Sequence, residues 1–172
     1  MPPDLPPTIT NTATQRFLKA SRQPMSSSKS KPPENVKIRT LLETDLAAAI
    51  ELWSASEGVE LAEGDRPDEL QRYLRRNPHT SFGAYQGKAL VGAVLGGHDG
   101  RRGFLYHLSV ASEFRGHGLG RALVEQSLAA LRTEGIARVL ILVARDNPQG
   151  AAFWRSVRWE PLDFAEPMGI DL

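Results

Sequence analysis

The sequence lacks cysteine, with none among its 172 residues. Disulfides, thiolate metal sites and a cysteine nucleophile are therefore excluded, so any acyl or phosphoryl chemistry must proceed without a protein thiol. An excess of charge of one sign is also absent, because 21 lysines and arginines are matched by 20 aspartates and glutamates. This balance argues against a nucleic-acid partner, since such proteins gather basic residues on one face.

Long apolar runs are missing as well. No stretch approaches the roughly 20 apolar residues that cross a bilayer, and no signal-peptide core follows Met1. We therefore expect no membrane partner and a cytoplasmic location.

Residues 1–35 differ from the rest of the chain because they are rich in proline and serine. Such a segment cannot bury enough apolar surface to offset the entropy of ordering. We expect a disordered arm at 1–35 and one folded domain at 36–172. Met25 is an alternative start site, in which case residues 1–24 would not belong to the native protein.

From Val36 onward, strand and helix patterns alternate. Thr44 is placed to cap the first helix, Pro67 fits the first turn of the second, and Gly135 fits the end of the long one. The continuous apolar run at 137–143 predicts a central strand covered on both faces. This order predicts an α/β (α+β) fold with a mixed sheet and helices on both faces. The patterns give strands at 36–40, 81–85, 90–95, 104–110 and 137–143, helices at 44–56, 66–76, 118–134 and 147–157, and room for one or two short strands after 157.

The segment "RGHGLGRA" places three glycines before the long helix. Its spacing fits neither the Gly-x-Gly-x-x-Gly loop of dinucleotide-binding folds nor the Gly-Lys-Ser/Thr ending of a phosphate-binding P-loop. Unpaired N–H groups at a helix N-terminus still bind phosphate, and flanking arginines would add positive charge. A glycine-rich strand-to-helix turn without a ligand is the alternative. The residues concerned are Arg115, Gly116, His117, Gly118, Leu119, Gly120 and Arg121.

The same residues resemble the Arg/Gln-x-x-Gly-x-Gly/Ala signature of the GNAT superfamily of N-acetyltransferases. The resemblance extends through "HLSVASEFRGHGLGRALVEQSLAAL" and "RVLILVARDNPQGAAFWRSVRW" and covers roughly residues 36–172, as in small single-domain bacterial members. It implies a mostly antiparallel central sheet that is splayed where acyl-CoA binds. It also implies acetyl-CoA as the donor co-substrate, with no metal.

The resemblance carries particular roles onto this chain. The loop from Arg115 to Arg121 would cradle the pyrophosphate of coenzyme A. The backbone of Leu108, Ser109 and Val110 would pair with the pantetheine amides, although Leu108 and Val110 would be core residues under any interpretation. Asn147 would bond the pantetheine arm, or would only cap the helix that follows. Phe153 and Trp154 would line the thioester channel.

The catalytic residues are harder to assign. Relatives commonly place a general-acid tyrosine where this chain has Trp154, and some place a glutamate where it has Leu142. Tyr106 and His107 are the candidates that remain. The alternation of a strand would put Tyr106 on the same face as Leu108 and His107 on the other, unless a bulge intervenes. A hydrogen-bonded core histidine is the alternative for His107.

Four carboxylates, Glu57, Glu60, Glu63 and Asp65, follow the first helix. They would form an acidic lip that favours a cationic amine, or else a run of solvated loop residues. We therefore predict transfer of an acetyl group from acetyl-CoA to a small-molecule or protein amine, directly in a ternary complex. The alternatives are a non-catalytic acyl-CoA-binding or regulatory module and a nucleotide-phosphate binder. The sequence leaves a homodimer open.

Overall fold

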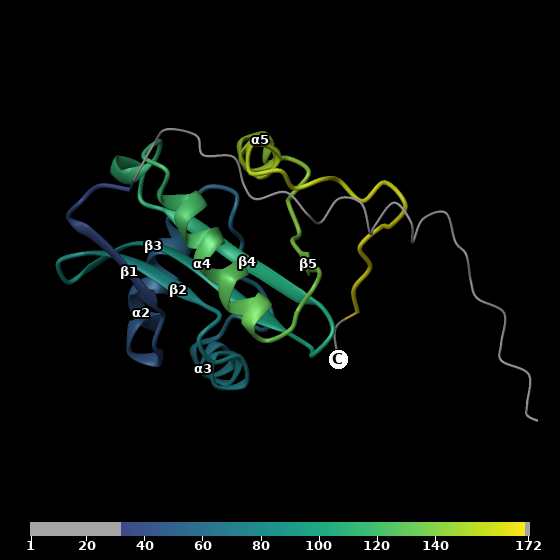
Figure 1. The fold of residues 1–172 in the computed structure, drawn as a ribbon, viewed down its shortest axis with the longest axis horizontal. Coiled ribbons are helices and arrows are strands. Elements are labelled where there is room, and N and C mark those ends of the chain that lie inside the picture. Colours follow the sequence, from purple (N-terminus) through teal and green to yellow (C-terminus); the bar gives the residue numbers. More distant parts are fainter. Residues whose placement is uncertain (1–31, 171–172) are drawn as a thin grey trace, which may run out of the picture.

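A five-stranded sheet organises the chain, seen in a computed structural model that describes residues 32–170 (Figure 1). Neighbouring strands run antiparallel from β1 to β4, and β5 joins β4 in parallel. The predicted mixed, mostly antiparallel sheet is thus confirmed. Most of the predicted arm at 1–35 lies outside the described residues. The strands, in spatial and chain order, are β1 (Val36–Thr40), β2 (Phe82–Gln86), β3 (Ala89–His98), β4 (Gly103–Val110) and β5 (Val139–Leu140).

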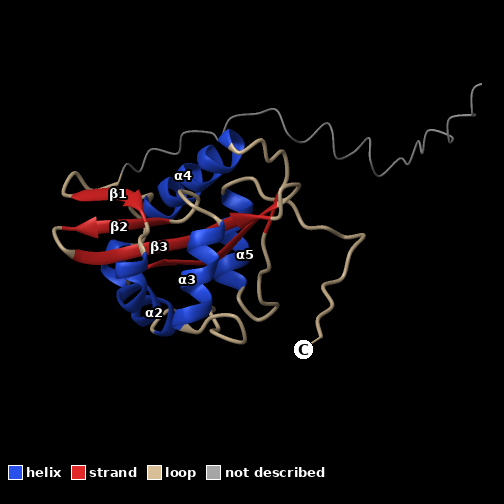
Figure 2. Ribbon diagram, turned by 90° about the horizontal axis from the view of Figure 1, so that it is seen from below, coloured by secondary structure: helices blue, strands red, loops and turns tan. Residues whose placement is uncertain are grey.

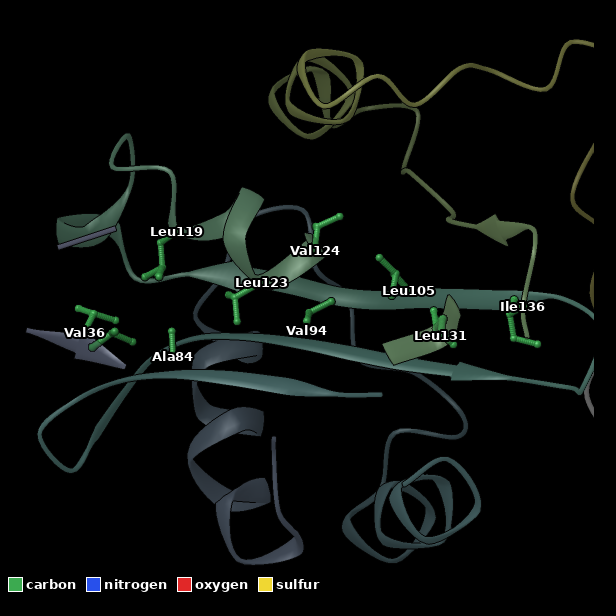
Figure 3. Close-up of a cluster of buried hydrophobic side chains, with 10 residues drawn as sticks. Val36, Ala84, Val94, Leu105, Leu119, Leu123, Val124, Leu131 and Ile136 are labelled. Carbon is green, nitrogen blue, oxygen red and sulfur yellow. The ribbon is translucent and has the colours of Figure 1, made fainter. Parts of the chain in front are cut away.

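Helices cover both faces of this sheet, as predicted (Figures 1 and 2). α2 (Leu46–Ser54) and α3 (Pro67–Arg76) lie on one face, where Trp53, Leu70 and Leu95 share a buried cluster. α4 (Leu119–Thr133) lies on the other face, and its cluster is shown in Figure 3. α5 (Pro148–Ser156) follows β5 on the same side as α4. Among residues 32–170, no helix combines the length and apolarity needed to cross a bilayer.

Several helix ends follow from single residues. Pro67 begins α3, where a missing N–H costs nothing, and Asn77 ends it. Gly135 ends α4 in the left-handed conformation, with φ +78°. The predicted cap at Thr44 is wrong, because α2 begins at Leu46 after a short 3-10 turn. The Asp45 carboxylate, held by Arg39, accepts the Leu42 N–H at 2.9 Å and fixes that turn instead.

The prediction of a central strand at 137–143 is also wrong. β5 contains two residues and lies at the edge of the described sheet, and the side chain of Leu142 is 67% exposed. An apolar run has no period of its own, so its burial depends on what returns to cover it. Residues 157–170 form no strand that does so.

β4 and β5 separate soon after they meet. They pair only at Gly103–Val139 and Phe104–Leu140, although β4 continues to Val110. The edge of β4 beyond Phe104 therefore has no strand beside it on the β5 side. This is the predicted splay of the sheet.

Candidate active site

The separation of β4 from β5 opens a cleft of about 1240 Å³. Its walls come from β4, from the glycine loop (residues 115–121), from the α2–α3 loop (residues 55–66) and from the segment that contains α5. All but one of the predicted site residues line this cleft. The exception is His117, whose side chain is exposed to solvent outside the cleft.

The glycine loop connects β4 to α4 and forms one end of the cleft. Gly116 and Gly118 have φ of +77° and +76°, a region that other residues rarely adopt. Gly118 is the N-cap of α4, so the N–H groups of the first helical turn lie at the cleft wall without partners inside the helix. Leu119 contributes only its backbone there, because its side chain is 1% exposed and packs in the core. This arrangement can bind a phosphate group.

The two arginines of the loop are fixed by carbonyl groups. Arg115 Nε donates to the Val110 oxygen at 2.9 Å, and Arg121 Nη2 donates to the Ser156 oxygen at 3.3 Å. Both residues line the cleft. Positive charge therefore accompanies the helix N-terminus at this end of the site.

Aromatic side chains of α5 form another wall, next to the glycine loop. A Cβ on Gly120 would lie 3.4 Å from Phe153, an ordinary contact distance, so the ring lies next to the start of α4. The rings of Phe153 and Trp154 pack edge to face at 5.2 Å, and Trp154 packs against Trp159 at 5.0 Å. Phe153 and Trp154 both line the cleft.

A β-bulge in β4 changes which side chains share a face. Ala93 of β3 pairs with Ser109, and Leu95 pairs with Tyr106, so two residues of β4 oppose one of β3. His107, one of the two, has φ +51°. Leu108 now packs with the core on the α4 side, whereas Tyr106 packs on the α2–α3 side. The prediction that Tyr106 and Leu108 share a face is therefore wrong, because the bulge interrupts the alternation.

The same bulge brings His107 to the α2–α3 side. Its Nε2 lies 2.8 Å from the Asp65 Oδ1, and its ring lies 5.1 Å from that of Trp53. Asp65 also accepts the Ala62 N–H at 3.0 Å, which holds the carboxylate in place. The side chains of His107 and Asp65 are 13% and 16% exposed, so the pair is shielded from most solvent. A histidine oriented by a carboxylate at a cleft wall can accept a proton from a substrate.

Tyr106 lies beside this pair. Its ring stacks on Phe104 at 5.7 Å and meets Tyr73 edge to face at 6.3 Å. Burial, together with the charge of Asp65, raises the pKa of the Tyr106 hydroxyl above its usual value. Tyr106 therefore stays protonated at neutral pH and can act as a hydrogen-bond donor.

Asn147 joins the two sides of the cleft. Its side-chain oxygen accepts the Gly150 N–H at 2.7 Å and caps α5, and its Nδ2 donates to the Gly58 oxygen at 3.4 Å. Gly58 has φ +76°, and a Cβ there would collide with the Asn147 side chain. The alternative role of Asn147 as a helix cap is thus present in the structure.

Charges divide along the cleft. Exposed carboxylates of Glu57, Glu60 and Asp146 line it near the Asn147–Gly58 contact, and among the described residues they form no ion pair that would neutralise them. The arginines lie at the glycine loop. The cleft can therefore attract an anion at the glycine loop and a cation near the Asn147–Gly58 contact.

Sequence reasoning missed the pairing of Asp65 with His107. The two residues are 42 positions apart, and Asp65 looked like one of four loop carboxylates. The left-handed backbone of His107 had no signal in the sequence. Among the described residues, no cluster of three or more His, Asp or Glu side chains is arranged to hold a metal ion.

Comparisons with known proteins identify the family of the chain. The family model described as the acetyltransferase (GNAT) family matches residues 46–157. An acetyltransferase of Yersinia enterocolitica is 31% identical over 130 residues, which make up 74% of this chain and 90% of that protein.

Two solved structures show the same fold. An aminoglycoside acetyltransferase from an uncultured soil sample, in complex with sisomicin, has a TM-score of 0.64 and 19% identity, covering 80% of this chain and 96% of that one. The PaiA N-acetyltransferase of Thermoplasma acidophilum, in complex with coenzyme A, has a TM-score of 0.61 and 20% identity, covering 70% and 86%. Because the family model matches more than half of this chain, the chain is a member of the GNAT family of acetyltransferases.

Proposed function

We propose that the protein transfers an acetyl group from acetyl-CoA to an amine, directly and in a ternary complex. The observation that carries this proposal is that one cleft holds both a phosphate-binding helix N-terminus and the His107–Asp65 pair. The first recognises the donor, and the second serves the acceptor. Because the chain has no cysteine, the acyl group cannot form a thioester intermediate with the protein.

The residues of the cleft fit coenzyme A. The left-handed backbone of Gly116 leaves nothing within 4 Å of where a Cβ would stand, so a pyrophosphate has room beside it. The unpaired edge of β4 at Leu108–Val110 offers backbone groups to the pantetheine amides. Phe153 and Trp154 supply an apolar wall for the thioester.

Acetyl transfer requires an uncharged amine, because an alkyl ammonium has a pKa of about 10 and is not nucleophilic. We assign His107 as the general base that takes the proton of the acceptor amine. Asp65 is the residue that orients the His107 ring. Trp154 cannot replace a general-acid tyrosine. A thiol pKa of about 8.5 makes the departing thiolate a fair leaving group, so this loss is tolerated.

The carboxylates of the cleft favour a cationic amine as the acceptor. Glu57, Glu60 and Asp146 line it, and unneutralised carboxylates lower the free energy of a nearby positive charge. Small-molecule and protein amines both satisfy this requirement. We therefore expect amines with a second positive charge to be better acceptors than neutral ones.

Two measurements test the proposal. Titration calorimetry should show binding of acetyl-CoA and CoA but not of ATP alone, and thiol release should depend on an added amine. Tight CoA binding with no release across an amine library would favour a non-catalytic acyl-CoA-binding module. Absence of CoA binding would remove the proposal altogether.

A matched pair of substitutions tests whether the donor binds at the glycine loop. Asp and Asn both tolerate a positive φ, so Gly116→Asp and Gly116→Asn strain the loop similarly and differ in charge. A carboxylate about 6 Å from a phosphate raises the binding free energy by about 2–3 kcal/mol, or about 30- to 150-fold in Kd. We expect Gly116→Asp to weaken CoA binding by at least about tenfold relative to Gly116→Asn. Equal affinities would place the pyrophosphate elsewhere.

A further inference from the structure

Lysine and arginine are unevenly distributed along the chain. Three of the five lysines lie in residues 1–31, which precede the described structure, whereas 14 of the 16 arginines lie in residues 32–172. The two remaining lysines, Lys37 and Lys88, are exposed and do not line the cleft. A guanidinium stays protonated in proteins, so an arginine is no acceptor for an acetyl group. Most of the side-chain amines that could take an acetyl group therefore lie in residues 1–31, which we call the N-terminal segment.

One of these amines has neighbours that set it apart. Lys19 lies in "RFLKASR" (residues 16–22), with an arginine three positions away on either side and a Phe-Leu pair directly before it. Lys29 and Lys31 lie in "SSSKSKPP", which contains neither an arginine nor a large apolar residue. Lys19 is thus the lysine of the N-terminal segment that combines several positive charges with apolar surface.

The wall of the cleft complements this sequence. Glu57, Glu60 and Asp146 place three exposed carboxylates there. Leu142, four positions before Asp146, is 67% exposed and lines the same cleft. The carboxylates would attract the three cations of residues 16–22, and contact with Leu142 would remove apolar surface of the Phe-Leu pair from water.

The N-terminal segment joins the domain beside the cleft. Val36, which begins β1, packs in the same buried cluster as Leu119, and Figure 3 shows both at one end of that cluster. Leu119 is part of the cleft wall at the glycine loop. The 13 residues from Lys19 to Pro32 span up to about 45 Å when extended, and a folded domain of this size is about 37 Å across. This length of chain lets Lys19 reach the cleft of its own molecule.

We propose that Lys19 is an acetyl acceptor for this protein's own cleft, so that the chain acetylates itself at this residue. The proposal rests on the acetyl transfer proposed above and names one acceptor for it. His107 takes a first proton from the Lys19 ammonium and passes it to water. The neutral Nζ then forms a bond to the carbonyl carbon of acetyl-CoA, the C–S bond breaks, and a second proton of the nitrogen passes through His107 to the thiolate. The products are acetyl-lysine, free CoA and one proton released to water.

Two properties follow from a reaction within one chain. Lys19 loses its positive charge, so the carboxylates no longer attract it, and each chain reacts once. Without an added amine, the release of CoA therefore stops at about one equivalent per chain, and steady turnover still requires an added amine. The rate constant does not depend on protein concentration, because the amine and the cleft belong to the same molecule.

The test is to incubate the 172-residue protein with acetyl-CoA alone and to follow each lysine by peptide mass spectrometry. We expect Lys19 to be acetylated at least about tenfold faster than Lys29 and Lys31, because ion pairs and apolar contact favour it. Since Lys29 and Lys31 belong to the same segment, they control for proximity alone. The rate constant should stay within about twofold when the protein is diluted about tenfold. His107→Gly should slow acetylation of Lys19 by about 10²- to 10⁴-fold.

The chain offers a matched pair of substitutions. Lys19→Arg keeps the positive charge and removes the amine, so it should lose the equivalent of CoA that is released without an added amine. Lys29→Arg makes the same change ten positions away and should keep that release.

Four results would overturn the proposal. Equal acetylation of all five lysines that is unchanged in His107→Gly would be chemical acylation by the thioester. A rate constant that rises in proportion to protein concentration would show transfer between chains. A wild type that acetylates added amines but not Lys19 overturns the self-acetylation and leaves the proposed function intact. A wild type that binds CoA and acetylates neither overturns both.

Discussion

The substitution His107→Gly separates the chemistry of the site from its folding. His107 has φ +51°, and holding a residue other than glycine there costs about 1–3 kcal/mol, which glycine would recover. The loss is the hydrogen bond to Asp65, worth about 1.5–3 kcal/mol when the carboxylate is ionised. The packing of the ring against Trp53 is lost as well, and glycine loses more entropy on folding, so the losses outweigh the gain. We expect the free energy of unfolding to fall by about 1–3 kcal/mol, which leaves the protein folded.

Activity should respond very differently. A positioned general base contributes about 10²- to 10⁴-fold, so kcat/KM of His107→Gly should fall by that factor. Thiol release measures the rate, and urea unfolding measures stability. Added imidazole should restore part of the rate, because the glycine leaves space beside Asp65 for a free base.

His79 provides the control for backbone strain. It also has a positive φ, +65°, but it is exposed and lies outside the cleft. His79→Gly should leave activity unchanged and raise the free energy of unfolding by up to about 1 kcal/mol, since glycine also loses more entropy on folding. Wild-type activity in His107→Gly would refute the reasoning. An equal fall in kcat/KM in His107→Gly and His79→Gly would also refute it.

Two further predictions concern the frame of the site. Asn147→Ala should lower the free energy of unfolding by about 1 kcal/mol, because the cap of α5 is lost. Asn147→Asp keeps the cap and loses only the hydrogen bond to the Gly58 oxygen, so it should be more stable than Asn147→Ala. Equal stabilities of the two variants in urea unfolding would contradict this. Burial opposes ionisation of Asp45, but hydrogen bonds from Arg39 and the Leu42 N–H prevail and lower its pKa below the unfolded value of about 4. The stability that ionised Asp45 contributes is therefore present above about pH 4 and is lost as the pH falls through the folded pKa. The difference in Tm between wild type and Asp45→Asn should therefore shrink from about pH 7 to about pH 3, followed by circular dichroism.

The features of the fold that depend only on residues close together in the sequence could be predicted from it. Pro67 and Gly135 mark helix ends through their own backbone chemistry, and the glycine loop shows its helix N-terminus directly. The run at 137–143 was misjudged because its apolar residues say nothing about what lies beside them. Exposure of Leu142 depends on the path of residues that come later in the chain.

The candidate site divides in the same way. The donor end lies within a short stretch of sequence, and the structure gathers it in one cleft except for His117. The acceptor end depends on a bulge opposite Val94 and on contact between segments 42 positions apart. Neither has a local signature, so the role of Asp65 and the face of Tyr106 required the fold.

All three tryptophans of the chain report on this cleft. Trp53 packs against the His107 ring, Trp154 lines the cleft, and Trp159 packs against Trp154. Indole emission responds to the polarity and charge around the ring. The unmodified protein therefore carries its own optical probes, one beside the proposed base and two beside the proposed donor channel, with no tryptophan elsewhere to add background.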